Sequence, residues 1–245
     1  MTQNQSPQPT VAAERYHLID ALRGLSILLM VGFHLGVNME IMDMAPAWFR
    51  DSALLQNILQ PFFGGLFILL AGVSSRFSRS NLRRGAIALA CAYAVSAVMI
   101  MLSFRDPSVS PVYFGILHFM GVAMLIYGVA KPALDAIPRI VQPFLYGTLF
   151  IGTYAYFPIF IAKDTGVFMP LGLYNTWGAD YFPLIPWLFL FLFGTWLGAL
   201  IKERKFPEWF YRFNMPVLPW VGRHTLIIYL AHQPVLYGLL TLINK

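Results

Sequence analysis

The sequence has little charge. Asp, Glu, Lys and Arg make up only 11% of its 245 residues, while 58% are hydrophobic. Soluble domains carry about 25% charged residues, and no soluble core of this size could bury so much apolar surface. The sequence therefore predicts an all-α, polytopic integral membrane protein of the cell membrane, in contact with the lipid bilayer. The basic residues lie in short loops between apolar runs, which argues against a nucleic-acid partner.

Cysteine is nearly absent as well. Cys91 is the only one, so an intrachain disulfide is excluded, and its place inside an apolar run predicts a buried, inert thiol. The N-terminus lacks a short apolar core followed by a small-residue cleavage site, which argues against a removed signal peptide. Residues 1–17 are polar and contain Pro7 and Pro9, so we expect a disordered cytoplasmic tail before a transmembrane domain over residues 18–245.

The apolar residues fall into seven runs that suit a hydrocarbon core of about 30 Å. We expect a helical bundle with seven transmembrane helices, and we expect five prolines to bend or break helices locally. The runs extend from about Leu18 to Asn38, Ile58 to Val73, Gly85 to Ser103, Pro111 to Ala130, Ile140 to Ala162, Phe182 to Ile201 and Thr225 to Ile243, and the prolines are Pro143, Pro158, Pro183, Pro186 and Pro234.

The loop charges predict the orientation. With the N-terminus in the cytoplasm, only Arg50, Arg105, Lys163 and Lys245 of the 17 Lys and Arg residues lie outside. Cytoplasmic loops carry the excess of basic residues in membrane proteins. This asymmetry predicts a cytoplasmic N-terminus and an external C-terminus.

Polar residues that a bilayer should exclude mark the candidate site. Arg23 and His34 lie in the first run, eleven residues apart. In a helix this spacing puts both on one face, about 16 Å apart along the axis. Ionisable groups inside a bilayer are costly and should face the bundle interior or a wet cavity. We predict that His34 is a general base near the outer face, the alternative being a histidine that only bonds a neighbouring helix.

His118 and Asp180 are expected at a similar depth. Either one could take part in catalysis by orienting the imidazole of His34. Two structural roles remain open: His118 could bond a carbonyl in a helix interface, and Asp180 could cap the sixth helix.

Basic residues gather at the predicted cytoplasmic ends of the helices. Most are expected to anchor loops to anionic headgroups, although a few could hold phosphates. They are Arg76, Arg79, Arg83, Arg84, Lys202, Arg204, Lys205, Arg212 and Arg223. In the last run, Pro234 cannot donate to the carbonyl of Leu230, so we expect a kink with His232 and Gln233 facing inward. This would suit a cofactor channel and a packed kink equally well.

Five segments together carry a family resemblance. The opening RYHLIDALRGLSILLMVGFH resembles that of the heparan-α-glucosaminide N-acetyltransferase catalytic-domain family, in its short bacterial form. FILLAGVSSRFSRSNLRRG, FGILHFMGVAMLIYG, DYFPLIPWLFLFLFGTWLG and GRHTLIIYLAHQPVL resemble its later blocks in the expected order, from about Arg15 to Leu240. Arg23 and His34 also match the R-x10-H motif of the wider integral-membrane acyltransferases.

The resemblance implies an enzyme that takes an acyl group, here acetyl, from cytosolic acyl-CoA. The acceptor would be an amino or hydroxyl group of a sugar or glycan on the other side of the membrane, and no metal is implied. The predicted catalytic residues are His34, His118 and Asp180, and the predicted donor-binding residues are Arg23, Arg223, His232 and Gln233.

One departure from the family bears on the chemistry. Eukaryotic members place their proposed catalytic histidine in the loop after the first helix, but residues 39–54 contain no histidine. Either His34 takes that role or the chemistry differs. The chain also has fewer spans than those members and no lumenal domain, so heparan itself is not an expected substrate. A transporter or lipid-binding membrane protein is the alternative, and a homodimer stays open.

Overall fold

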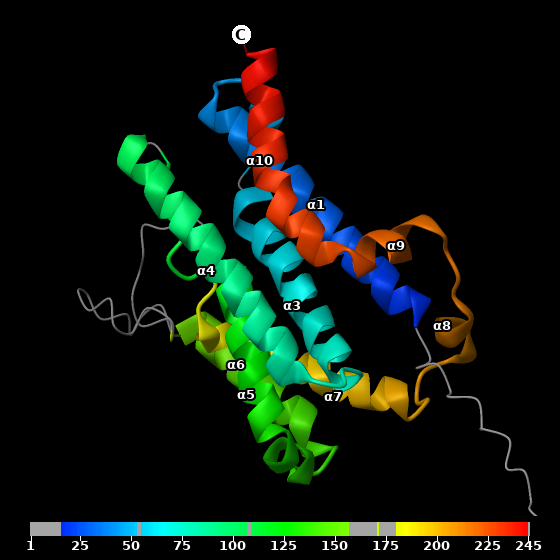
Figure 1. The fold of residues 1–245 in the computed structure, drawn as a ribbon. Coiled ribbons are helices and arrows are strands. Elements are labelled where there is room, and N and C mark those ends of the chain that lie inside the picture. The colour runs from blue at the N-terminus through cyan, green and yellow to red at the C-terminus, as the bar shows by residue number, and fades with distance from the viewer. Residues whose placement is uncertain (1–15, 53–54, 107–108, 157–170, 172–179, 245) are drawn as a thin grey trace, which may run out of the picture.

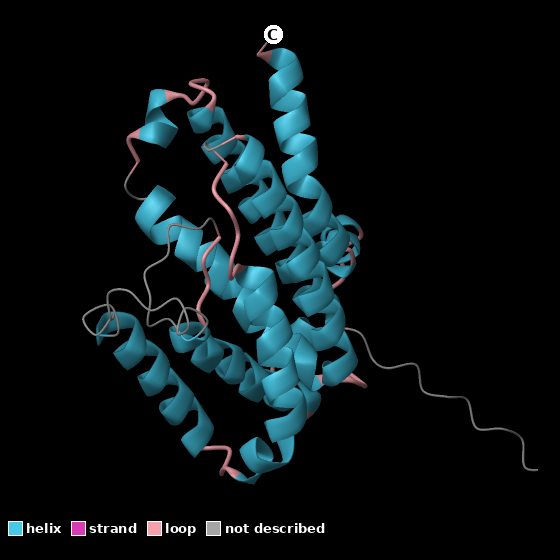
Figure 2. Cartoon of the chain, turned by 60° about the vertical axis from the view of Figure 1, so that its left-hand side comes forward, coloured by secondary structure: helices cyan, strands magenta, loops and turns pink. Residues whose placement is uncertain are grey.

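The computed structural model describes residues 16–52, 55–106, 109–156, 171 and 180–244, and its elements in these ranges are helices (Figure 2). In chain order they are α1 (His17–Ile41), α2 (Ala47–Arg50), the π-helix η1 (Leu55–Leu59), α3 (Gln60–Arg76), α4 (Asn81–Arg105), α5 (Ile116–Ala136), α6 (Val141–Tyr156), α7 (Leu184–Lys202), α8 (Glu208–Arg212), α9 (Val217–Arg223) and α10 (Thr225–Ile243).

Each of the seven apolar runs corresponds to a helix. Five of these helices, α1, α4, α5, α7 and α10, are long and apolar enough to cross a membrane. The helix α3 is shorter, as is the described part of α6. The predicted all-α, multi-pass class is therefore confirmed, whereas a count of seven spans and their orientation stay predictions.

The most extensive contact between two helices is that of α3 with α7, which cross near the lower end of α3 in Figure 1. Their backbones approach closely because glycines face the partner helix. A Cβ on Gly72 would lie 2.0 Å from the carbonyl oxygen of Phe191, and one on Gly194 would lie 2.1 Å from that of Leu69. Small residues allow such close helix packing where lipid removes the hydrophobic drive between helices.

A second crossing fixes α9 against the first half of α1. A Cβ on Gly222 would lie 1.8 Å from the carbonyl oxygen of Asp20. Since α10 begins directly after α9, this crossing also sets where α10 starts alongside α1 (Figure 1).

The largest core cluster joins α3, α5, α6 and α7. Tyr127, Phe119 and Phe191 are almost completely buried in it. A smaller cluster of Ala88, Ala92 and Leu117 joins α4 and α5 to α10. Cys91 packs against this cluster and is half-buried, so the thiol is less enclosed than predicted.

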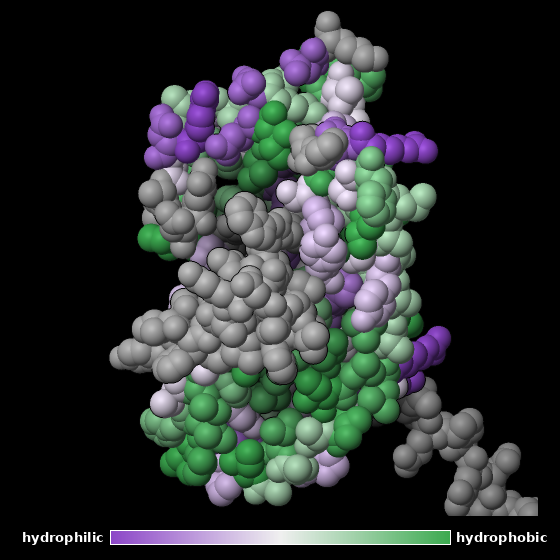
Figure 3. Space-filling model, turned by 90° about the vertical axis from the view of Figure 1, so that its left-hand side faces the viewer, coloured by the Kyte–Doolittle hydropathy of each residue, from purple (hydrophilic) through white to green (hydrophobic). Residues whose placement is uncertain are grey.

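The outer helix faces expose large apolar side chains. Phe104 on α4 is 84% exposed, Phe144 on α6 is 71% exposed, and Ile227 on α10 is 65% exposed. Figure 3 shows apolar surface over the lower part of one face and hydrophilic residues at its upper edge. Exposed apolar area of this extent marks a membrane or protein interface in a stable protein, as expected for lipid-facing helices.

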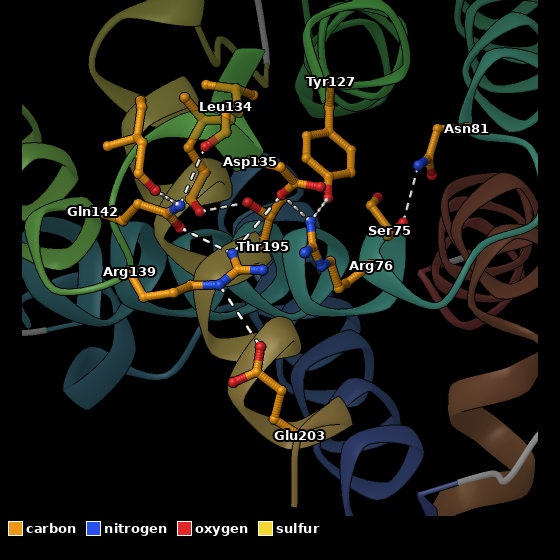
Figure 4. A network of polar contacts seen from close by, with 12 residues as sticks. Ser75, Arg76, Asn81, Tyr127, Leu134, Asp135, Arg139, Gln142, Thr195 and Glu203 are labelled. Carbon is orange, nitrogen blue, oxygen red and sulfur yellow. Dashed lines mark hydrogen bonds and ion pairs between the residues drawn. The ribbon is translucent and has the colours of Figure 1, made fainter. Parts of the chain in front are cut away.

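At one end of the bundle a polar network ties four helices together (Figure 4). Arg76, at the end of α3, donates to the hydroxyl of Tyr127 at 3.1 Å and pairs with Asp135, both on α5. Arg139, just before α6, lies 3.7 Å from the carboxylate of Glu203 at the end of α7. Arg76 therefore has a structural role at this end, beyond the headgroup or phosphate contacts considered for the basic loops.

Two other predictions concern the tail and the prolines. Residues 1–15 lie outside the described ranges, while Tyr16 packs on the ring of Phe77 with centroids 5.2 Å apart, directly before α1. Ile185 has non-helical backbone angles between Pro183 and Pro186, which confirms a local break there. The other prolines differ: Pro158 is outside the described residues, Pro143 lies in the first turn of α6, and α10 continues through Pro234.

Candidate functional site

The polar stripe of α1 faces α10. Because α1 is unbroken from His17 to Ile41, Arg23 and His34 share one face, as predicted. Arg23 donates from Nη2 to Thr225 Oγ1 at 3.0 Å, and Gln233 bonds the ring of His34 at 3.1 Å. The two helices therefore run side by side in the same direction.

Gln233 orients the imidazole of His34. Its Nε2 donates to His34 Nδ1, and its Oε1 accepts from Asn38 Nδ2 at 2.9 Å. Asn38 is buried, with 7% of its surface exposed. The sequence predicts His118 or Asp180 in this orienting position. The structure instead puts Gln233 there, a residue predicted to bind the donor.

A second imidazole lies beside the first. The ring centroids of His34 and His232 are 5.0 Å apart. His232 Nδ1 bonds the backbone carbonyl of Tyr229, and its Nε2 is buried without a hydrogen-bond partner among the residues that the structure describes. His232 therefore lies near His34, at the opposite end of the stripe from Arg23.

Asp180 reaches the same region from the segment before α7. One carboxylate oxygen accepts from the Tyr229 hydroxyl at 2.7 Å and from the Ile116 backbone N–H at 3.2 Å. Asp180 thus caps α5, whereas the N-cap of α7 is Pro183. Burial raises the pKa of Asp180 to about 6, outweighing these two hydrogen bonds, which lower it.

His34 and Asp180 line one pocket, part of which is open to the outside. The other lining residues are Met30, Phe33, Phe63, Gly64, Phe67, Ile116 and Phe182, which are apolar side chains apart from the glycine. A site with few polar groups and apolar walls strengthens the electrostatic effect of each polar group in it.

His118 does not line this pocket. Its Nδ1 accepts from the backbone N–H of Gly115, its Nε2 lies 3.3 Å from Ser96 Oγ, and 2% of its surface is exposed. Both ring nitrogens are therefore engaged at the junction of α4 and α5. This geometry favours the structural role, and a catalytic role for His118 stays a prediction that the contacts do not support.

At the other end of the stripe, guanidinium groups outnumber their acidic partners. Arg23 lies 3.7 Å from Asp20 and has 21% of its side chain exposed. Arg84 of α4 is close enough for its charge to interact with that of Arg23. Its backbone N–H donates to the Ser80 carbonyl, but its guanidinium has no hydrogen bond or ion pair within the described ranges. Arg223 ends α9 next to Thr225 and is exposed. This excess of positive charge suits an anionic ligand.

Two residues of the site were not predicted. Asn38 lies one helical turn after His34, and Tyr229 lies one turn before Gln233. Extending each polar stripe by one turn would have included both. The pairing of α1 with α10 joins residues about two hundred positions apart, and no local pattern indicates it.

The profile of the heparan-alpha-glucosaminide N-acetyltransferase catalytic family matches residues 15–234. The match covers α1 to the middle of α10, and so includes every site residue above. None of the curated proteins and none of the solved structures matches this chain significantly.

Proposed function

The chain belongs to the heparan-alpha-glucosaminide N-acetyltransferase catalytic family, a family of membrane acetyltransferases, and from this premise we propose its reaction. It transfers an acetyl group from acetyl-CoA to an amino or hydroxyl group of a sugar or glycan. The donor enters from the cytoplasmic side, and the acceptor is on the other side of the membrane.

The observation that carries this proposal is the stripe of α1 against α10. Its basic end and its imidazole end are about 16 Å apart along one unbroken helix. An extended donor with phosphates at one end and a thioester at the other matches this arrangement. A single helix pair can therefore hold the nucleotide and position the reactive group.

At the basic end, Arg23, Arg84 and Arg223 bind the phosphates of CoA. The planar guanidinium group offers paired N–H donors that suit phosphate oxygens. An anion between Arg23 and Arg84 would also relieve the repulsion between their charges.

At the other end, the acetyl thioester occupies the pocket lined by His34 and Asp180. The apolar walls exclude water, so a hydrogen bond to the developing oxyanion stabilises the transition state strongly. A basic group in this pocket takes the proton of the acceptor.

The test is acetyl transfer by the purified protein in lipid vesicles. Acetyl-CoA labelled in the acetyl group is supplied with a panel of amino sugars and glycans, and released CoA thiol and labelled product are both measured. We expect thiol release that depends on the acceptor, and its loss in His34→Leu. His17→Gln is the matched control, because His17 is exposed at the start of α1.

Two results would contradict the proposal. Absence of thiol release with every acceptor would remove the enzyme class. Movement of an intact labelled solute across the vesicle membrane without thioester cleavage would support the transporter alternative.

A further inference from the structure

The pocket beside His34 also contains the carboxylate of Asp180. Among its described lining residues, these two have side chains that exchange protons, and most of the others are phenylalanines. A proton that leaves the acceptor inside this pocket therefore has two possible destinations. The other hydrogen bonds of the two side chains decide between them.

The contact of His34 with Gln233 occupies a ring lone pair. Gln233 accepts from Asn38 through Oε1, so its amide nitrogen faces His34 Nδ1. An amide NH₂ group only donates, and therefore Nδ1 accepts. In the neutral ring the other nitrogen, Nε2, then carries the hydrogen. His34 thus offers the pocket an N–H donor and has no free lone pair.

The contacts of Asp180 leave one carboxylate oxygen free. Its Oδ2 accepts from the Tyr229 hydroxyl at 2.7 Å and from the Ile116 backbone N–H at 3.2 Å. Its Oδ1 has no hydrogen bond in the described part of the chain and, unlike His232 Nε2, is not an enclosed atom without a partner. Because Asp180 is half-buried and lines the pocket, Oδ1 is available to a ligand there.

The backbone around Asp180 holds this carboxylate in place. Asp180 has a φ of 56°, in the left-handed region that few residues other than glycine adopt. The next two residues pair with the segment before α5, Tyr181 through a bridge to Gly115 and Phe182 through its N–H to the Phe114 carbonyl at 3.3 Å. Residues held in such conformations cluster at active sites and ligand clamps.

We infer that Asp180 takes the proton of the acceptor and that His34 donates a hydrogen bond to the oxyanion, an inference that rests on the proposed function. It reverses the role that the R-x10-H spacing predicts for His34. Burial raises the pKa of Asp180 to about 6, and a base works best when its pKa lies near the operating pH. The apolar walls that raise this pKa also strengthen the hydrogen bond from His34.

The step is balanced as follows. The oxygen or the neutral amine nitrogen of the acceptor forms a bond to the thioester carbonyl carbon while its proton passes to Asp180 Oδ1. The π electrons of the carbonyl move to its oxygen, which accepts the N–H of His34. When the carbonyl re-forms, the carbon–sulfur bond breaks, its electron pair leaves on sulfur, and the CoA thiolate takes the proton from Asp180. No further reactant is needed.

Few titratable groups face Asp180. Tyr229 on α10 bonds its carboxylate, and His34 on α1 lines the same pocket. The lining residues from α3 and α5 carry no titratable side chain; they are Phe63, Gly64, Phe67 and Ile116. Variants of Asp180, Tyr229 and His34 therefore separate the contributions to the pH profile.

The first test is Asp180→Asn. Its amide oxygen can still accept from Tyr229 and Ile116, whereas an NH₂ group takes the place of Oδ1 and cannot accept a proton. We expect transfer to fall by roughly 10² to 10⁴, with acetyl-CoA binding unchanged. Wild type and variant are assayed with the same acceptor, so that titration of the acceptor cancels in the ratio of their rates. This ratio should grow as pH rises through about 6 and stay constant above about pH 7. A loss below tenfold, or a ratio that does not change with pH, would overturn the inference.

The second test moves the titration without removing the carboxylate. The hydrogen bond from Tyr229 lowers the pKa of Asp180, so Tyr229→Phe should shift the midpoint of the rate profile upward by roughly one pH unit. A carboxylate that only caps α5 would leave this midpoint in place, and that result would overturn the inference. This variant decides alone if Asp180→Asn does not fold, as judged by thermal unfolding.

The third variant, His34→Leu, separates the two roles. It should lower transfer at every pH by roughly 10² to 10³ and leave the midpoint near 6. Loss of the pH dependence in His34→Leu, together with its retention in Asp180→Asn, would make His34 the base and overturn the assignment. A wild-type protein without transfer to any acceptor would instead contradict the proposed function.

Discussion

Arg23 has one hydroxyl and one carboxylate as neighbours, Thr225 at 3.0 Å and Asp20 at 3.7 Å. Arg23→Lys keeps the positive charge but removes the planar pair of donors. We expect acetyl-CoA to bind roughly ten to a hundred times more weakly, the range for losing a charge-assisted hydrogen bond. Titration of the purified variant with acetyl-CoA measures this loss.

The matched control is Arg212→Lys on α8. Arg212 is 82% exposed in its side chain and pairs with the neighbouring Glu208. Its replacement should leave donor affinity unchanged. Wild-type affinity in Arg23→Lys would assign Arg23 to helix packing with Thr225.

Asp180 predicts a pH dependence of stability. Its pKa in the folded protein is about 6, against 3.8 for an unperturbed Asp carboxyl. The folded state therefore holds this proton more tightly, and stability falls as pH rises from about 4 to about 6. In Asp180→Asn the amide oxygen can still accept from Tyr229 and Ile116, and this pH dependence is lost.

The measurement is thermal unfolding of both proteins between pH 4 and pH 8. The melting temperature of Asp180→Asn minus that of the wild type should rise between pH 4 and pH 6 and stay constant above pH 7. A difference that does not change with pH would mean that the carboxyl titrates normally in the folded protein.

The sequence predicted which residues belong to the candidate site better than it predicted which of them contact one another. The common face of Arg23 and His34 was predictable because helical periodicity is local. The bridge from His34 through Gln233 to Asn38 was not, because it depends on how α1 and α10 pair. His118 shows the opposite error, since a buried histidine can be engaged entirely by its own helix start and a neighbouring serine.

Among the elements, the crossing of α3 and α7 depends on glycine. Gly194→Ala would place a Cβ 2.1 Å from the carbonyl oxygen of Leu69, so the helices must separate. We expect a clear loss of thermal stability, of the order of 1–3 kcal/mol as for an overpacked core, measured by unfolding in a mild detergent.

Gly147→Ala on α6 is the control for this substitution. A Cβ at Gly147 meets nothing within 4 Å. Alanine should be neutral there or stabilise the helix by up to about 1 kcal/mol. Equal stability of Gly194→Ala and the wild type would show that α3 and α7 can separate at little cost.

The long helices were predictable, whereas the short ones were not. Continuous apolar runs marked α1, α3, α4, α5, α6, α7 and α10. The helix α9 has only seven residues, in a segment with Pro216 and Pro219, so its apolar residues form no run long enough to predict a helix. Its position depends on the contact of Gly222 with α1, which only the folded chain shows.

For the whole molecule, the contacts of α1 and α10 restrict the topology. Thr225 begins α10 beside Arg23 near the start of α1, and Gln233 lies beside both His34 and Asn38 further along. The two helices are therefore parallel. Both are long and apolar enough to cross a membrane, so the two ends of the chain should lie on opposite sides of the bilayer.

The basic residues then predict which side is cytoplasmic. Arg23 and Arg84 lie at the same end of the bundle. The end of α3, the end of α5 and the start of α6 also lie at this end, where Asp135 pairs with Arg76 and Arg139. An excess of Lys and Arg marks the cytoplasmic side of short loops. This end should therefore face the cytoplasm, where acetyl-CoA is available.

Reporter fusions test both statements. A reporter after Lys245 should be active outside the cytoplasm, and reporters at the N-terminus and near Arg79 should be active inside it. If the N-terminal and C-terminal reporters agree, α1 and α10 do not both span the membrane in the same direction. If they differ but in the reverse order, the parallel pair is retained and the donor end faces outward, where cytosolic acetyl-CoA could not reach Arg23.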